Sequence, residues 1–199
     1  MTQTPDGGLS SGQLYARAMR QTDRIIGNVR PDQWTAPTPC TEWNIRDVVN
    51  HIVGENLWAV ELFQGKTIED VGDRLNGDLV GNDPAGAYAR SVPVASAAAE
   101  APGAMDATCH LSFGDFPGSE YAWQLFLDTL IHGWDVASAS GQDRTLDSGL
   151  VQAAMPFAQR MTEQWRSAGV FGEKLDVGSN AGPQAELLAL FGRRADWNP

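Results

Sequence analysis

The sequence predicts an all-α protein, and two patterns support this fold class. Segments with helical periodicity alternate with glycine and proline punctuation, and long strand-like alternation of Val, Ile and Thr is nearly absent. A chain of 199 residues is long enough to bury one hydrophobic core without staples. We expect residues 1–199 to form a single domain, with a bundle core over about 11–167 and a C-terminal extension over about 168–199.

Two helices are expected in the first third of the chain. Helical periodicity covers about residues 11–29 and stops before a proline. The second helix is expected to begin near Asn44, a favourable N-cap residue with Asp47 three positions later, and to run to about residue 63. Its apolar stripe brings His51 toward the core.

The middle of the chain combines a loop, a helix and one short strand. Residues 65–82 are acidic and contain glycines, which favours a loop with at most a short helical turn. A third helix is expected over about 83–101, because an aspartate N-cap is followed by proline at the first helical position. Pro93 inside this helix predicts a kink or a break. The one strand candidate covers 108–113, and a turn is expected over 114–118.

The fourth helix is expected over about 119–140, with Gly141 as its C-terminal stop. It is apolar on nearly all sides, so it should lie at the centre of the fold. A fifth helix follows from residue 147 or 148 to about 167, and a short last helix covers 183–191. Four long helices then form the bundle core, and the terminal elements pack outside it.

Composition and charge exclude several classes of function. Lys and Arg number 14 against 25 Asp and Glu, a net charge of −11, which repels nucleic acid and anionic lipid surfaces. No run approaches the roughly 18–20 apolar residues that a membrane helix needs. The first residues lack the pattern of a secretory signal, so we expect a cytoplasmic protein. In that compartment Cys40 and Cys109 stay free thiols, and we expect them to be small buried hydrophobes rather than nucleophiles.

The fourth helix carries a carboxylate and an imidazole on one face. Asp128 and His132 are four residues apart, which brings their side chains together on the helix surface. This face points to the core, where an ionised carboxylate needs a cationic partner such as a divalent metal. If the second helix packs against the fourth, His51 supplies a third ligand. Two imidazoles and one carboxylate with open positions suit catalytic zinc, nickel or iron.

Plainer interpretations of the same residues stay open at this level. Asp128 and His132 can form an ion pair or a hydrogen bond without a metal, and His51 can be a structural core residue. Glu55, four residues after His51, either adds a ligand, accepts a hydrogen bond or faces solvent. Asp135, three residues after His132, either orients the imidazole ring or faces solvent.

Three segments of the chain resemble one known family. The first is TPCTEWNIRDVVNHIVG at residues 38–54, and the second is DTLIHGWDVA at residues 128–137. The third, AGPQAELLALFGR at residues 181–193, is similar to the tail of single-domain members. Together they resemble the mycothiol-dependent maleylpyruvate isomerase N-terminal domain family of the DinB-like metal-binding superfamily. The resemblance spans nearly the whole chain.

The resemblance implies a DinB-like four-helix bundle with a divalent metal at one end, held by His51, Asp128 and His132. Zinc is the first expectation, and nickel and iron are the alternatives. The isomerase has Glu where this chain has Asp128, which is one methylene shorter. It also carries a further C-terminal domain for which this chain is too short, so its specific reaction is not transferred.

In the family, the metal activates a low-molecular-weight thiol such as mycothiol, because coordination deprotonates a thiol at neutral pH. The resemblance therefore implies a thiol-dependent transferase or isomerase that acts on a small electrophilic substrate, and a homodimer is compatible with it. One rival function is a non-catalytic metal sensor or sequestering protein with the same three ligands, closed by a fourth ligand such as Glu55 or His110. The other is a metal-free helical domain in which a hydrogen bond or a shifted pKa neutralises Asp128.

Overall fold

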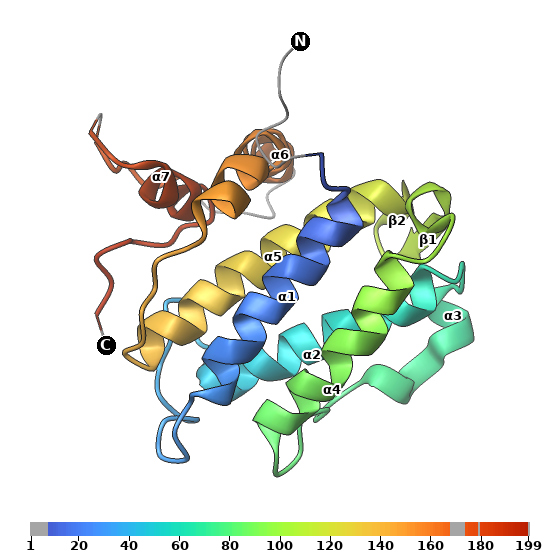
Figure 1. Ribbon diagram of the computed structural model, residues 1–199, viewed down its shortest axis with the longest axis horizontal. Helices are drawn as coiled ribbons and strands as arrows, with labels where there is room; N and C mark the ends of the chain where they lie inside the picture. Colours follow the sequence, from blue (N-terminus) through green and yellow to red (C-terminus); the bar gives the residue numbers. More distant parts are fainter. Residues whose placement is uncertain (1–7, 168–173, 179, 199) are drawn as a thin grey trace.

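Long helices packed against one another form the centre of the molecule (Figure 1). In the computed structural model, α1 and α2 each lie against both α4 and α5, which closes a four-helix bundle. The bundle helices are α1 (Ser11–Gly27), α2 (Ile45–Leu62), α4 (Pro84–Ala99) and α5 (Gly118–Ala139). The structure describes residues 8–167, 174–178 and 180–198. The predicted all-α four-helix bundle is therefore confirmed.

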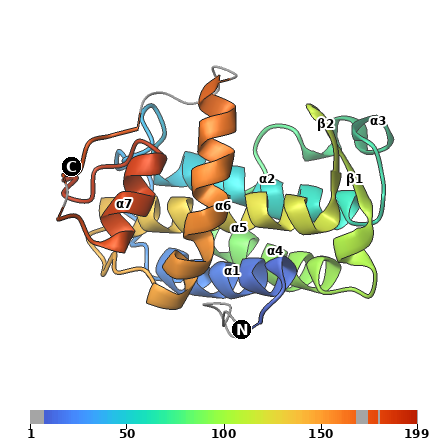
Figure 2. The same cartoon turned by 90° about the horizontal axis from the view of Figure 1, so that it is seen from above.

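Shorter elements connect and cover the bundle. After α2 come α3 (Ile68–Val71), a 3-10 turn (Gly72–Leu75) and, beyond α4, a second 3-10 turn (Ala104–Asp106). A hairpin of β1 (Thr108–Leu111) and β2 (Gly114–Pro117) precedes α5. The remaining helices are α6 (Ser148–Ser167) and α7 (Pro183–Leu190). Figure 2 shows α6 lying across the bundle with α7 beside it, and α6 contacts both α5 and α7.

The helix starts follow the predicted local chemistry. Asn44 caps α2 by accepting from the backbone N–H of Asp47, and the Asp47 carboxylate accepts from the N–H of Asn44 in return. Asp83 caps α4, whose first residue is Pro84. Both features were expected from sequence and are confirmed.

Two expectations in the middle of the chain need correction. α4 continues through Pro93, so of the predicted kink or break, the break does not occur. Residues 114–118 were expected to form a turn, but Gly114–Pro117 form β2, paired antiparallel with β1. A strand that begins with glycine and ends with proline has weak intrinsic propensity, so pairing with the neighbouring strand decides its conformation. The expected domain boundary near residue 167 stays a prediction.

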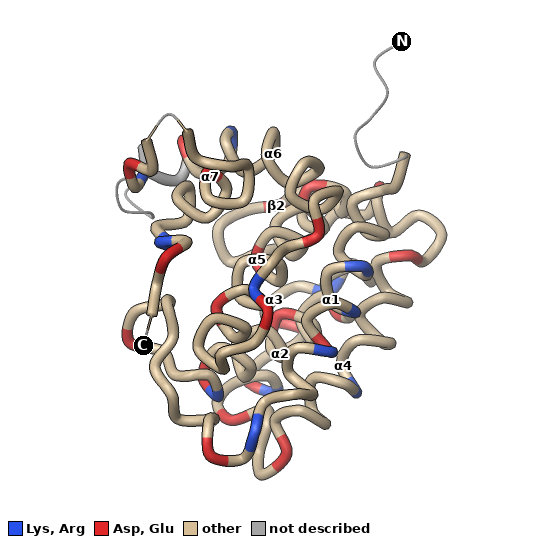
Figure 3. Tube along the Cα trace, turned by 60° about the vertical axis from the view of Figure 1, so that its left-hand side comes forward, with Lys and Arg blue, Asp and Glu red and all other residues tan. Residues whose placement is uncertain are grey.

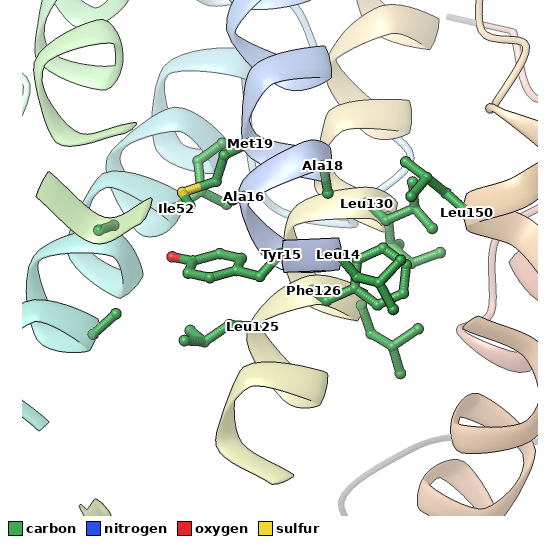
Figure 4. Close-up of a cluster of buried hydrophobic side chains, with 14 of the residues drawn as sticks. Leu14, Tyr15, Ala16, Ala18, Met19, Ile52, Leu125, Phe126, Leu130 and Leu150 are labelled. Carbon is green, nitrogen blue, oxygen red and sulfur yellow. The ribbon is translucent and has the colours of Figure 1, made fainter. Parts of the chain in front are cut away.

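The core is centred on α5, as its all-round apolarity predicts. Figure 4 shows Leu14 and Tyr15 of α1 beside Leu125 and Phe126 of α5, with Leu150 of α6 on the outer side. All five side chains are buried. At about 1.5–3 kcal/mol for each large apolar side chain, this seam contributes much of the free energy that holds α1 against α5.

Charged residues lie mostly outside this core. Figure 3 shows Asp and Glu positions spread over the helices and loops, interspersed with fewer Lys and Arg positions. Within the described residues, no helix combines the length and apolarity needed to cross a membrane.

A buried polar network fixes the register of three bundle helices. The Tyr15 hydroxyl on α1 donates to Oδ1 of Asn56 on α2 over 2.5 Å. Asn56 in turn donates to Oγ of Ser91 on α4 over 2.8 Å, and Ser91 donates to the carbonyl of Tyr88. Because Tyr15 and Asn56 are fully buried, water cannot replace a partner that is lost.

The Tyr15→Phe variant is therefore expected to lose about 1–2 kcal/mol of unfolding free energy, since it leaves an Asn56 oxygen without its donor. Urea denaturation followed by circular dichroism measures the change. An unchanged midpoint and slope would show that the network does not contribute to stability.

Candidate metal centre

The three side chains expected to bind a metal converge at the contact between α2 and α5. Oδ1 of Asp128 lies 3.2 Å from Nε2 of His51 and 3.5 Å from Nε2 of His132. The centroids of the two imidazole rings are 5.0 Å apart. One ligand atom from each of the three residues lies within 4.8 Å of the other two. The packing of α2 on α5 thus brings His51 to the pair spaced four residues apart, as expected.

One oxygen of the Asp128 carboxylate lacks a hydrogen-bond donor within the described part of the chain. Oδ2 of Asp128 lies 3.2 Å from Nε2 of His51, yet it is shielded from water and accepts no hydrogen bond within the described part of the chain. A buried carboxylate oxygen without a hydrogen bond is costly. Two imidazole nitrogens directed at one such carboxylate form a donor set that suits a divalent cation.

The electrostatics of the cluster link Asp128 to both histidines. Burial alone would raise the pKa of Asp128, but the positive charge of His51 and its hydrogen bond, together with the neighbouring basic side chains, outweigh burial and lower the pKa below its usual value. Burial alone would lower the pKa of His51, but the Asp128 carboxylate outweighs it and raises the pKa to about 9. Without a metal, His51 is therefore protonated at neutral pH and neutralises Asp128.

This coupling predicts a pH dependence for the metal-free protein. His51 should titrate near pH 9, well above the ordinary histidine value of 6.5. The ion pair therefore stabilises the fold fully below about pH 6.5 and loses its effect as the pH rises through about 9. In Asp128→Asn the His51 pKa should fall below 6.5, because burial then dominates. Titration of the imidazole C–H signals by NMR measures both values, and a wild-type value at or below 6.5 would contradict this electrostatic account.

Asp135 holds the His132 ring in place. Its Oδ2 lies 3.0 Å from Nδ1 of His132, and the side chain is fully buried. A carboxylate accepts hydrogen bonds, so Nδ1 carries the proton and Nε2 is free to bind a ligand. The orienting role considered for Asp135 is observed, and a solvent-facing role is excluded.

Two further residues, Arg193 and Trp43, lie at the cluster. The guanidinium of Arg193 donates to both carboxylate oxygens of Asp135, with Nε 3.2 Å and Nη2 2.9 Å from them. The ring of Trp43 lies 5.0 Å from that of His51 and 5.7 Å from that of His132. Both residues fall at motif positions, the first at the end of the similar tail and the second beside the N-cap of α2, but spacing alone does not place them at the cluster.

A pocket with a volume of about 260 Å³ opens beside the three side chains. Its walls are mostly apolar and come from the hairpin, α5, α6 and the segment after α7; they include Leu111, Phe113, Leu125, Ile131, Met161 and Phe191. Glu55 also lines it. Burial, reinforced by the nearby Asp128 charge, raises the pKa of Glu55 to about 7. The pocket gives a small molecule a largely apolar approach to the cluster.

Cys109 is buried as expected, whereas Cys40 is only half-buried. Burial raises the pKa of the Cys109 thiol to about 11, and the residue is fully buried. Burial also raises the pKa of Cys40, which is half-buried beside His132 and Asp135. Both thiols are therefore protonated at neutral pH, which makes them poor nucleophiles.

Comparison with known proteins identifies the family. The model of the mycothiol maleylpyruvate isomerase N-terminal domain matches residues 15–137, more than half of the chain. The chain belongs to this family. The matched segment of this family member includes His51, Asp128, His132 and Asp135, whereas Arg193 lies beyond it.

Relatives and solved structures agree with this assignment. This chain is 33% identical over 185 residues to two uncharacterized proteins of Mycobacterium tuberculosis, from strains CDC 1551 / Oshkosh and H37Rv. The matches cover 90% of this chain and 95% of each relative. A crystal structure of the mycothiol-dependent maleylpyruvate isomerase matches with a TM-score of 0.61 at 15% identity, over 82% of this chain and 72% of that one. A mutant of the same isomerase matches equally well. At this identity the structural match establishes the shared fold.

Proposed function

We propose that the protein binds one divalent metal ion through His51, Asp128 and His132 and uses it to activate a small thiol, mycothiol, for reaction with an electrophilic substrate. The observation that carries this proposal is the convergence of three ligand atoms within 4.8 Å of one another, beside an open pocket. The buried Asp128 oxygen without a hydrogen bond fits the same set. Zinc is the ion we expect, with nickel and iron as alternatives.

Membership of the family supports the thiol. The family is defined by a mycothiol-dependent isomerase domain, and the isomerase of known structure shares the fold. A bound divalent ion would supply a positive charge that lowers the pKa of a thiol, so that thiolate forms at neutral pH. The chain's own residues then bind and orient: Asp135 keeps Nε2 of His132 free, and the apolar pocket walls exclude water from the reacting groups.

The ligand set favours an enzyme over the rival metal sensor or sequestering protein. A storage or sensing site is typically closed by a fourth protein ligand. Among the described residues, neither Glu55 nor His110 belongs to the cluster, and His110 instead pairs with Asp115 on the hairpin over 2.8 Å. The centre therefore keeps positions for a thiol on the pocket side.

The reaction class is either transfer of the thiol to an electrophilic carbon or reversible addition with isomerisation. The experiment incubates zinc-loaded protein and mycothiol with a panel of electrophiles, maleylpyruvate among them, and follows both the loss of mycothiol, which reports transfer, and the conversion of the electrophile, which also reports isomerisation. Wild type should accelerate at least one reaction, and His132→Ala should not. His110→Ala is the matched control, because it removes a histidine outside the cluster and should keep the wild-type rate. Zinc-loaded wild type that accelerates none of the reactions would favour the sensor or sequestering protein.

A further inference from the structure

The segment after α7 directs one arginine at the candidate metal centre. Gly192 adopts a left-handed conformation with φ of 72°, and its N–H bonds to the carbonyl of Ala189. The next N–H, that of Arg193, bonds to the carbonyl of Leu188 over 3.0 Å. This pair of bonds is a Schellman motif, which ends the helix and turns the chain sharply. The backbone of Arg193 is thereby fixed relative to α7.

The guanidinium of Arg193 makes its hydrogen bonds beside the candidate metal centre. Nη1 donates to the carbonyl of Phe191 over 2.9 Å. Nε donates to Oδ1 of Asp135 and Nη2 donates to Oδ2. Only 15% of the Arg193 side chain is exposed, and Asp135 is fully buried. A planar, two-bond grip of this kind fixes the plane of the carboxylate, which a single point charge does not do.

The carboxylate that Arg193 holds is the one that holds His132. Oδ2 of Asp135 accepts from both Nη2 of Arg193 and Nδ1 of His132. Any rotation of the carboxylate therefore moves the acceptor that fixes the imidazole ring and its tautomer. Without the guanidinium, Asp135 would be a buried charge lacking its strongest partner and would reorganise.

We propose that Arg193 is a positioning residue of the metal centre, acting through Asp135 to present Nε2 of His132. This inference rests on the proposed metal binding. It means that the C-terminal segment, which lies beyond the family match at residues 15–137, completes a site whose ligands all come from the bundle. Arg193 sets how tightly the ion binds without touching it.

The first test is zinc affinity, measured by competition with a chromophoric chelator. Arg193→Gln should weaken zinc binding about 10–100-fold, the range for losing an orienting partner. Arg193→Lys keeps the charge but not the two-bond grip, so it should give a smaller loss of about three- to tenfold. Arg194→Gln is the matched control, because the neighbouring Arg194 is exposed and pairs with Asp196. It should bind zinc like wild type.

A double-mutant cycle tests the route through Asp135. Asp135→Asn alone should weaken zinc binding, and adding Arg193→Gln should weaken it no further, because both changes remove the same arrangement. The double variant also has no unpaired buried carboxylate, so it should fold even if Arg193→Gln is unstable. Losses that multiply in the double variant would overturn the proposed route.

A second readout needs no metal. The chain has three histidines, so ring ¹⁵N spectra of the metal-free protein are simple to assign. Wild type should show His132 with the proton on Nδ1, and Arg193→Gln should show a population with the proton on Nε2. Wild type that binds zinc, together with an Arg193→Gln variant that has unchanged affinity and tautomer, would overturn the role of Arg193 alone. Wild type that binds no zinc would overturn the metal centre and this inference together.

Discussion

Asp128→Ala is expected to weaken zinc binding by at least about a hundredfold, more than the loss of an orienting partner costs. Asp128 is the one carboxylate in the three-residue cluster and lies between the two imidazoles. Its removal leaves two neutral nitrogen ligands and no anionic ligand in the three-residue cluster. Competition titration of zinc against a chelator, at fixed pH and salt, measures the change.

Two control variants test whether the loss of zinc binding is specific to the Asp128 carboxylate. Asp128→Glu keeps the carboxylate and adds one methylene, so it should retain most of the affinity. Asp115→Ala removes a carboxylate that pairs with His110 on the hairpin and should leave zinc binding unchanged. An Asp128→Ala variant with wild-type affinity would mean that the carboxylate is not a ligand and that His51 and Asp128 form a plain ion pair.

Gly133→Ala is expected to destabilise the fold by about 2–3 kcal/mol, because α1 and α5 are in close contact at this position. A Cβ atom on residue 133 would stand 2.4 Å from Oγ1 of Thr22 on α1. Thr22 is buried and its hydroxyl donates to the carbonyl of Thr129, so it has little room to move. Alanine's helix propensity would by itself favour the variant by about 1 kcal/mol, so a net loss can be attributed to the clash.

A compensating change identifies the cause. Thr22→Ala removes Oγ1 and leaves its own Cβ at 3.4 Å from the new methyl group, an ordinary contact distance. The Thr22→Ala/Gly133→Ala variant should therefore recover most of the stability lost in Gly133→Ala. In the double-mutant cycle this recovery appears as a large favourable coupling energy between the two substitutions. Thermal and urea unfolding of the four proteins measure it. Additive losses would mean that the clash is relieved in another way.

Local signals in the sequence were enough to predict most of the fold. The caps at Asn44 and Asp83 mark helix starts within a residue, because side-chain capping depends on only a few neighbouring positions. The apolar surface of α5 marks it as central for a similar reason. β2 was missed because its conformation depends on pairing with β1 rather than on its own residues. α4 does not break at Pro93, because helix packing can accommodate a proline that an isolated helix would not.

In the candidate site, too, local spacing predicts some contacts, whereas others depend on how distant segments pack. The pairing of Asp128 with His132 follows from helical spacing, and His51 joins them once α2 is packed on α5. Asp135 lies on the same helix, so its orienting role was within reach of spacing arguments. Arg193 reaches Asp135 across 58 positions of the chain, and no periodic pattern encodes such a contact. It depends on where the helix α7 ends and on how the chain turns there.

The central claim is that His51, Asp128 and His132 form a metal centre, and metal content tests it most directly. Wild type and His132→Ala would be purified in parallel, incubated with zinc, dialysed against metal-free buffer and measured by elemental analysis. The account predicts about one zinc ion per chain in wild type and close to none in His132→Ala, with both proteins equally helical. Wild type without zinc, or equal zinc in both proteins, would contradict it.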